Sequence, residues 1–172
     1  METIAILREH DVYPDRKPVS DDSYEYSRQA TRMILRDEEG NVAVHYFPLK
    51  DNMSEGYMLP GGGIEEGESP EQGLRREAME ETGCMIEDIK ELGHVLEYGA
   101  GKKTKHIQNE YLYSANVQGD KGVWIPEQVE IDRGVELRWM PASALYAAIS
   151  AQKPSFSQAV ALIALRKYFD LK

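Results

Sequence analysis

Apolar and polar side chains alternate in two parts of the chain that are each interrupted by a polar turn. In RMILRDEEGNVAVHYF, residues 32–47, two β-rich runs flank a turn around Gly40. Alternation with a period of two, broken by a glycine-containing turn, predicts a β-hairpin. The β-rich runs at residues 88–98 and 106–117 predict a second hairpin, joined by GAGKKTK at residues 99–105.

The clearest helix signals lie in residues 70–83, directly after a glycine-rich stretch. Ser69 is a good N-cap residue, Pro70 suits the first helical position, and Gln72 follows the cap by three residues, as in a capping box. Gly83 is placed where a helix commonly stops, because glycine adopts the left-handed conformation without strain. We therefore expect a capped helix over this segment.

The last third of the chain predicts one short strand and two helices. ELRWMP at residues 136–141 has the pattern of a strand, and the segments at residues 143–150 and 157–169 have the pattern of helices. The last helix contains AVALIAL and is apolar nearly all round, so either its own domain or a second subunit must cover it. A homodimer therefore stays open.

The order of these elements predicts an α/β fold. Strands often follow one another directly and helices are few, which favours a mixed central β-sheet with helices on both faces. The length of 172 residues fits one compact domain. We expect that domain at residues 29–172, including the C-terminal helices, and an N-terminal arm or added strand at residues 1–28, where the chain is polar and contains prolines.

Composition narrows the classes of function. Acidic residues outnumber basic ones by 30 to 20 and the net charge is -10, which argues against binding a nucleic-acid polymer. A phosphorylated small molecule is not excluded, because carboxylates can hold a cation that carries the phosphates. The one cysteine favours a reducing compartment. With neither a signal peptide nor a membrane span in the sequence, we expect a cytoplasmic protein that binds no membrane.

Three carboxylates on the predicted helix are candidates for metal binding. Glu77, Glu80 and Glu81 are spaced i, i+3, i+4 and share one helix face. Carboxylates so arranged repel one another unless a divalent cation lies between them, and oxygen ligands suit Mg²⁺ or Mn²⁺. Arg76, one turn before Glu80, can hold a carboxylate by a bidentate contact. The alternative is a solvated acidic helix with ordinary charge pairs.

The glycines before this helix extend the pattern. From Gly62, the sequence GGIEEGESPEQGLRREAMEETGC places a glutamate, then Arg-Glu, then Glu-Glu, then a glycine at fixed spacings. This spacing resembles the Nudix box, the signature of the Nudix hydrolases, and every specified position matches. The resemblance is specific over residues 58–84 and extends loosely over about residues 29–150.

The resemblance implies a Nudix-type α/β/α sandwich and a Mg²⁺- or Mn²⁺-dependent hydrolase of a nucleoside diphosphate linked to another moiety. It assigns metal-binding or base roles to the carboxylates of the helix, namely Glu77, Glu80 and Glu81. By the same resemblance Arg76 orients these carboxylates and Glu68 supports the loop or the metal site. The backbone carbonyl of Gly62 is a further candidate ligand, since glycine lets the backbone come close.

In many Nudix hydrolases the general base, or a further metal ligand, comes from a later loop. The candidates here are Glu127, Glu130 and Glu136, and we select Glu130. For each of them a solvent-facing loop charge is the alternative. His45 and His106 lie in strand-like runs without partners at metal-ligand spacing, so we expect packing or surface positions for both.

The sequence says less about the substrate. Gly99 and Ala100 stand where relatives acting on ADP-ribose often have a proline, and the coenzyme A signature is missing. Elimination leaves a nucleoside triphosphate pyrophosphohydrolase of the MutT kind, or a hydrolase of another nucleoside diphosphate derivative. Lys102, Lys103 and Lys105 either steer an anionic substrate or form a solvated turn. A non-catalytic nucleotide sensor with the same fold is the alternative function, and the intact box favours catalysis.

Overall fold

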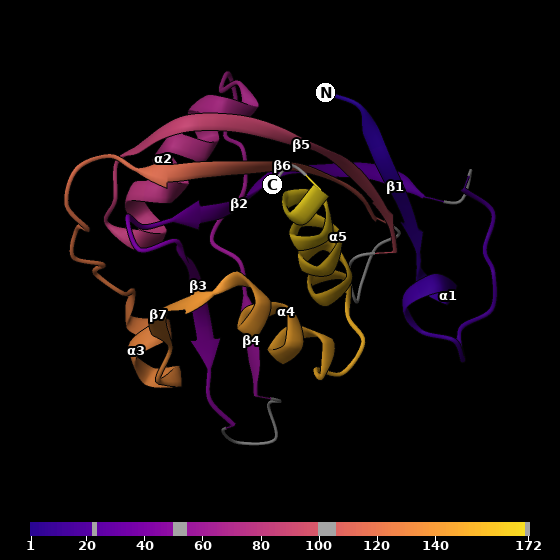
Figure 1. Ribbon diagram of the computed structural model, residues 1–172. Coiled ribbons are helices and arrows are strands. Elements are labelled where there is room, and N and C mark those ends of the chain that lie inside the picture. The colour runs from indigo at the N-terminus through magenta and orange to yellow at the C-terminus, as the bar shows by residue number, and fades with distance from the viewer. Residues whose placement is uncertain (22–23, 50–54, 100–105, 171–172) are drawn as a thin grey trace.

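The computed structural model (Figure 1) describes every part of the chain except residues 22–23, 50–54, 100–105 and 171–172. Its strands are β1 (Thr3–Arg8), β2 (Glu25–Arg36), β3 (Asn41–Phe47), β4 (Gly56–Met58), β5 (Ile86–Tyr98), β6 (His106–Val117) and β7 (Glu136–Pro141). Its helices are α1 (Glu9–Val12), α2 (Pro70–Thr82), α3 (Gln128–Arg133), α4 (Ala142–Ser150) and α5 (Phe156–Asp170).

The strands form one seven-stranded sheet with the order β1-β5-β6-β2-β3-β4, and β7 pairs with β3. The pairs β1–β5 and β2–β6 are parallel, whereas β2–β3, β3–β4, β3–β7 and β5–β6 are antiparallel. The mixed α/β fold is therefore confirmed. The lysines at 102, 103 and 105 lie outside the described residues.

The first hairpin turns where its polar residues predict. The backbone N–H of Asn41 donates to the Asp37 carboxylate at 2.7 Å, and Gly40 adopts a φ of 82°. Most residues other than glycine resist this left-handed conformation, so a glycine fits the turn at this position. The antiparallel pairing of β5 with β6 confirms the second hairpin.

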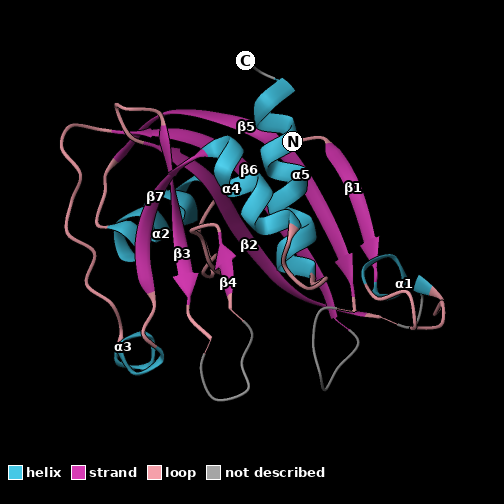
Figure 2. Ribbon diagram, turned by 60° about the horizontal axis from the view of Figure 1, so that its bottom comes forward, coloured by secondary structure: helices cyan, strands magenta, loops and turns pink. Residues whose placement is uncertain are grey.

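Helices cover both faces of the sheet, with α4 and α5 on one face and α2 on the other (Figure 2). Apolar residues of the sheet pack against α4 and α5 in one cluster that includes Ile34, Val95, Leu112, Leu145 and Leu165. A second cluster packs against α2 and includes Met33, Leu35, Leu74, Ala78 and Tyr113. Alternate residues of a strand point to opposite faces, which is why neighbours such as Met33 and Ile34 enter different clusters.

The last helix is covered on one side by its own domain. It buries Phe156, Val160, Ala161, Ala164, Leu165 and Tyr168. At the other end of the chain, β1 adds a parallel edge strand beside β5. In the described part of the chain, none of the helices combines the length and the apolar character needed to cross a membrane.

The glycine-rich segment after β4 is attached to β2. The backbone N–H of Met33 donates to the carbonyl of Pro60 at 3.0 Å, and that of Thr31 donates to the carbonyl of Gly62 at 2.9 Å. The backbone N–H of Ile64 in turn donates to the carbonyl of Gln29 at 2.9 Å. These bonds fix the loop against the edge of β2, directly before α2 begins.

Candidate active site

Helix α2 begins and ends with the caps that the sequence predicts. The Ser69 hydroxyl accepts a hydrogen bond from the Gln72 N–H at 3.2 Å, and the Gln72 side chain accepts one from the Ser69 N–H at 2.8 Å. Gly83 has a φ of 70° and closes the helix with its N–H on the Met79 carbonyl. The helix register, and with it the position of every carboxylate on α2, is set by these caps.

Gly62 makes room for a carboxylate. A Cβ atom at this position would lie under 3.0 Å from the carboxylate of Glu77, closer than real Cβ contacts allow. Glu77 itself is only 7% exposed, although it carries an ionisable group. The backbone of the glycine loop therefore lies against the Glu77 carboxylate, and a side chain at position 62 would separate them.

Arg76 is bonded to both parts of the box. Its Nε and Nη2 atoms form a fork on Glu68, at 2.9 and 3.0 Å. Nη1 donates to Glu77 at 2.8 Å and to Glu80 at 2.9 Å, while Nη2 also donates to the carbonyl of Gly63 at 2.6 Å. One guanidinium thus joins the loop to the helix, a use for which its planar set of donors is suited.

This network shifts the pKa values of its members in different directions. Hydrogen bonds from Arg76 and from the Glu65 backbone hold the pKa of Glu68 below its ordinary value. Burial raises the pKa of Glu77, and the two other glutamates of the α2 face add to this rise, against the opposing effect of Arg76. A buried carboxylate that is disfavoured in its charged form gains from a nearby cation.

Glu80 and Glu81 occupy different environments on the same helix face. The Glu80 side chain is 57% exposed. The Glu81 side chain is 28% exposed, and its Oε2 lies 3.0 Å from Nδ1 of His45. His45 is 1% exposed, and its Nε2 lies 2.8 Å from the backbone carbonyl of Glu81. The structure thus places His45 inside, in polar contact with a box residue.

A cavity of about 980 Å³ opens beside these residues. Its acidic lining comes from α2 and from the segment around α3, namely Glu77, Glu80, Glu81, Glu127 and Glu130. Backbone of the glycine loop also lines it, at residues 61–63. Its basic lining comes from β2 and α3, namely Arg28, Arg32 and Arg133. The cavity therefore has carboxylates and cations in one space, as binding a metal ion together with phosphate groups requires.

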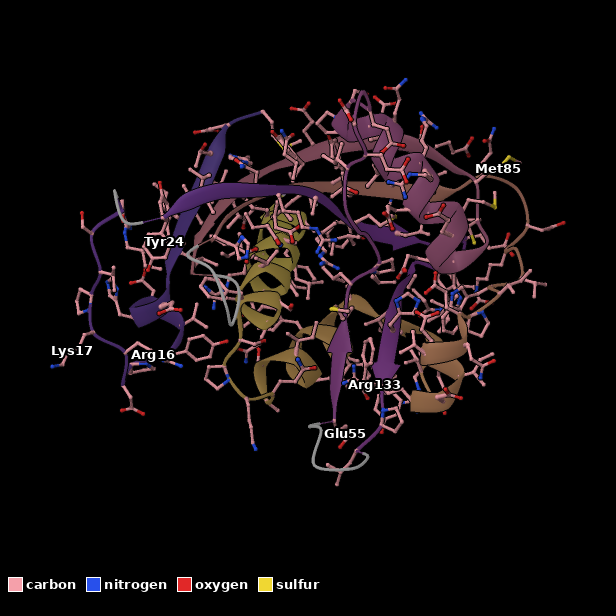
Figure 3. The ribbon with its side chains drawn as sticks, turned by 180° about the vertical axis from the view of Figure 1, so that it is seen from behind. Arg16, Lys17, Tyr24, Glu55, Met85 and Arg133 are labelled. Atoms are coloured by element: carbon pink, nitrogen blue, oxygen red, sulfur yellow. The ribbon has the colours of Figure 1, made fainter. Side chains whose placement is uncertain are left out.

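Arg133 lies at the end of α3 beside the end of β3 (Figure 3). Its guanidinium carbon is 4.5 Å from the centre of the Phe47 ring, within the range of a cation–π contact. Arg32 is held from the other side, since its Nη1 donates to the carbonyls of Leu59 and Gly61 at 3.2 and 3.1 Å. Arg32 is thus fixed against the backbone that leads into the glycine loop.

The start of α3 brings two late glutamates to the cavity. Glu127 and Glu130 line it, and the Glu130 carboxylate accepts a hydrogen bond from the Glu127 N–H at 2.7 Å at the start of α3. Glu136 is not among the lining residues and instead bonds Arg138 at 2.9 Å. Glu68 also lies outside the lining, where it contacts Arg76 and the Glu65 N–H.

The donor set of the cavity fits a divalent cation. Carboxylates on one helix face beside unencumbered glycine backbone supply the hard oxygen atoms that Mg²⁺ and Mn²⁺ prefer. Among the residues that the structure describes, no three His, Cys, Asp or Glu side chains are gathered as a ready-made metal site. The carboxylates of Glu77 and Glu80 contact Arg76, and that of Glu81 contacts His45.

The sequence pattern did not single out several residues of the cavity. Arg28, Arg32 and Arg133 are far from the box in sequence, and His45 was expected only to pack or to lie on the surface. No spacing rule links these positions to the box, because β2, β3 and α3 meet the end of α2 only in the folded chain.

Comparison with solved structures identifies similar folds. A MutT protein from Methanosarcina mazei Go1 has a TM-score of 0.55 at 19% identity, covering 87% of this chain and 97% of that one. A MutT structure described for Aliivibrio salmonicida and Vibrio cholerae has a TM-score of 0.55 at 16% identity, covering 85% and 99%. At this level of identity the likeness concerns the fold.

Comparison of sequences gives shorter matches. An 8-oxo-dGTP diphosphatase from Proteus vulgaris is 42% identical over 53 residues, 31% of this chain and 47% of that protein. An RNA pyrophosphohydrolase from Hydrogenovibrio crunogenus is 30% identical over 92 residues, 54% of this chain and 53% of that protein. The matches thus span about half the length of these curated relatives. The model of the NUDIX domain matches residues 26–160, most of the chain. The chain therefore belongs to the Nudix family.

Proposed function

We propose that this protein hydrolyses a diphosphate linkage in a nucleotide with the help of a divalent metal ion. The observation that carries the proposal is the cavity, where three box carboxylates face the same space as three arginines. A nucleoside diphosphate group carries several negative oxygens, so it needs cations around it, and the carboxylates need a cation between themselves and the substrate.

The chain's own residues have separate tasks in this proposal. Glu77, Glu80 and Glu81 would hold the metal, together with the backbone carbonyl of Gly62. A bound divalent cation supplies neutralisation of phosphate oxygens and activation of an attacking water. Arg76 keeps the carboxylates in place through its bonds to Glu77 and Glu80.

The arginines that line the cavity bind and orient the substrate in this proposal. Arg28 and Arg133 line the cavity with cationic groups able to take phosphate oxygens in bidentate fashion. Arg32 is already bonded to backbone carbonyls, so its charge acts on the substrate from a fixed position. Orientation of the diphosphate against the carboxylates is the condition for in-line attack.

A glutamate of the late segment accepts the proton of the attacking water in this mechanism. Glu127 and Glu130 both line the cavity, and we retain Glu130 as the proposed base. Glu136 is a weaker candidate for the base, because it does not line the cavity and is bonded to Arg138.

For the substrate we propose a nucleoside triphosphate, hydrolysed to a nucleoside monophosphate and pyrophosphate. The name of the Proteus vulgaris relative supports this substrate class. The name of the Hydrogenovibrio crunogenus relative points to the end of an RNA instead. The net charge of -10 supports the smaller substrate, because a polymer brings many phosphates that would be repelled.

Further expectations complete the proposal. We expect Mg²⁺ or Mn²⁺ as the metal, cytoplasmic localisation, and no membrane partner. A homodimer through the N-terminal arm or α5 is also proposed. Light scattering tests it, and a monomer mass would exclude it.

The experiment that tests the function measures product release from a panel of nucleotides, including capped or triphosphorylated RNA, with Mg²⁺ and with chelator. Added pyrophosphatase reveals pyrophosphate, and added phosphatase reveals monophosphates. Metal-dependent turnover of nucleoside triphosphates is the expected result. Folded protein that binds Mg²⁺ and a nucleotide but turns over none of the panel would favour the non-catalytic sensor.

A further inference from the structure

His45 contacts Glu81 through both of its ring nitrogens. Nε2 lies 2.8 Å from the Glu81 backbone carbonyl, and Nδ1 lies 3.0 Å from the carboxylate oxygen Oε2. The first contact reaches the last turn of α2, and the second reaches the side chain that projects from it. His45 is only 1% exposed, so its ring is shielded from water.

The two contacts have different consequences. A backbone carbonyl only accepts hydrogen bonds, so Nε2 carries the hydrogen in the first contact. The second contact places Nδ1 3.0 Å from the carboxylate, which limits the rotamers open to Glu81. The first contact secures the helix, whereas the second sets the direction of one carboxylate.

The same ring also faces the segment that leads to the late glutamates. The centres of the His45 and Trp124 rings are 4.9 Å apart, at 40°. Three residues after Trp124, Glu127 enters the lining of the cavity. A Cβ atom on Gly83 would lie under 3.0 Å from the backbone of Val123, so this segment also packs tightly on the end of α2.

We propose that His45 is a positioning residue of the metal site: it orients the Glu81 carboxylate and connects it to the segment of Glu127 through Trp124. This inference rests on the proposed function, in which Glu81 is a metal ligand. Partners that orient ligating groups typically change metal affinity by roughly 10–100-fold when they are removed. A buried residue with only a packing role changes stability instead.

Two amide substitutions separate the contacts of His45. In His45→Asn the amide nitrogen comes near the place of Nδ1, so the carboxylate contact is kept. In His45→Gln it comes near the place of Nε2, so the backbone contact is kept and the carboxylate contact is lost. We expect His45→Gln to weaken Mn²⁺ binding by roughly 10-fold or more and to lower kcat more than it raises KM. His45→Asn should retain more of both.

His94 supplies a matched control on β5. Its ring nitrogens are also bonded, to Thr3 at 3.1 Å and Asn109 at 2.9 Å, and its ring lies 5.0 Å from that of Tyr111. It does not line the cavity. His94→Asn and His94→Gln should therefore lower the unfolding temperature without changing Mn²⁺ affinity.

The measurement is the binding of Mn²⁺ to the full chain, followed by electron paramagnetic resonance of the free ion without substrate. Repeating it in a Glu81→Gln background should abolish the difference between the two His45 variants, because the effect passes through that carboxylate. Equal Mn²⁺ affinities of His45→Gln, His45→Asn and the unchanged protein would overturn the inference. Unchanged protein that binds no Mn²⁺ would overturn the proposed function itself.

A second measurement needs no His45 variant and applies even if these variants do not fold. Ring ¹⁵N signals of the histidines are recorded as Mg²⁺ is added. The His45 signals should move on saturation and those of His94 should not, and Glu81→Gln should remove the movement. A His45 ring that does not respond to bound Mg²⁺ would contradict the positioning role.

Discussion

Buried carboxylates lie beside arginines in two regions of this molecule, and the regions differ in what surrounds them. In the α2 region, Glu77 is 7% exposed, borders the cavity and is bonded to Arg76. On the other face of the sheet, Glu97 and Glu110 are each 2% exposed and come from the neighbouring strands β5 and β6. Neither of this second pair lines the cavity.

Among the described residues, the carboxylates of the second region have fewer hydrogen-bond partners than those of the α2 region. Glu110 accepts a hydrogen bond from Gln108 at 2.6 Å through Oε1, and its Oε2 is 3.6 Å from Nε of Arg32 without a hydrogen bond. Burial, reinforced by the charge of Glu110, raises the pKa of Glu97 to about 8. Arg32 reaches both regions, since it also bonds the carbonyl of Gly61.

Burial of a carboxylate beside an arginine is therefore not enough to identify a site. Glu77 has further carboxylates, glycine backbone and an open cavity around it, all of which a metal ion and a phosphate can use. Glu97 has a pKa raised by burial and is surrounded by protein, so its ionisation affects the stability of the fold. Matched substitutions in the two regions test this distinction.

The largest contrast concerns activity. Glu77→Gln should lower kcat by roughly 10²–10³-fold, the loss typical of removing one group that stabilises transition-state charge. Glu97→Gln, the same change at an equally buried glutamate, should leave kcat within about twofold. Steady-state kinetics at saturating Mg²⁺ measures both. Similar losses in the two variants would show that the two regions do not differ in this way.

The next contrast concerns stability against pH. The pKa of Glu97 rises from an ordinary 4.5 to about 8, so between these pH values the folded protein keeps a proton that the unfolded chain releases. The contribution of Glu97 to the free energy of unfolding is largest below pH 4.5, decreases as the pH rises to 8, and does not recover above pH 8. The protein should be less stable at pH 8 than at pH 5 by on the order of 2–4 kcal/mol from this group.

Urea unfolding at both pH values measures this difference. Glu97→Gln cannot ionise, so its stability should change less between pH 5 and pH 8 than that of the unchanged protein. Parallel pH profiles of the two proteins would contradict the assignment to Glu97.

The next prediction adds a methyl group where the glycine loop contacts helix α2. Gly62→Ala brings a Cβ atom against the Glu77 carboxylate and should destabilise the protein by about 1–3 kcal/mol while lowering Mn²⁺ affinity. Gly56→Ala is the control, because its Cβ would meet Gln152 at an ordinary 3.6 Å. Unchanged metal affinity in Gly62→Ala would show that this contact does not matter to the site.

The smallest expected effect is at the start of α2. Ser69→Ala removes the acceptor of the Gln72 N–H and should cost about 1 kcal/mol of unfolding free energy. Ser157→Ala, at an exposed position in the first turn of α5, should stay within about 0.5 kcal/mol. Thermal unfolding compares the two, and equal losses would mean that the cap does not stabilise α2.

The local elements could be predicted because each depends on neighbouring residues. The capping box of Ser69 and Gln72, the left-handed stop at Gly83 and the turn at Gly40 are contacts between residues a few positions apart. Their chemistry is therefore visible in the sequence. The box spacing likewise placed the three carboxylates on one helix face, and these line one cavity.

The rest of the site depends on contacts between residues far apart in sequence. His45 meets Glu81 across 36 positions, and Arg32 meets the backbone carbonyls of Leu59 and Gly61 across 27 and 29 positions. Sequence spacing also could not rank the late glutamates, whereas the cavity includes Glu127 and Glu130 and leaves Glu136 outside.

The sequence alone predicts the α/β class, the capped helix α2 and the position of three carboxylates on one helix face. Short-range hydrogen bonding and helix periodicity determine the last two. The folded arrangement determined which arginines share a cavity with those carboxylates, which glutamates are buried without lining it, and that His45 contacts Glu81. The physical reason is that burial and charge pairing depend on strand order and helix packing, which no local pattern specifies.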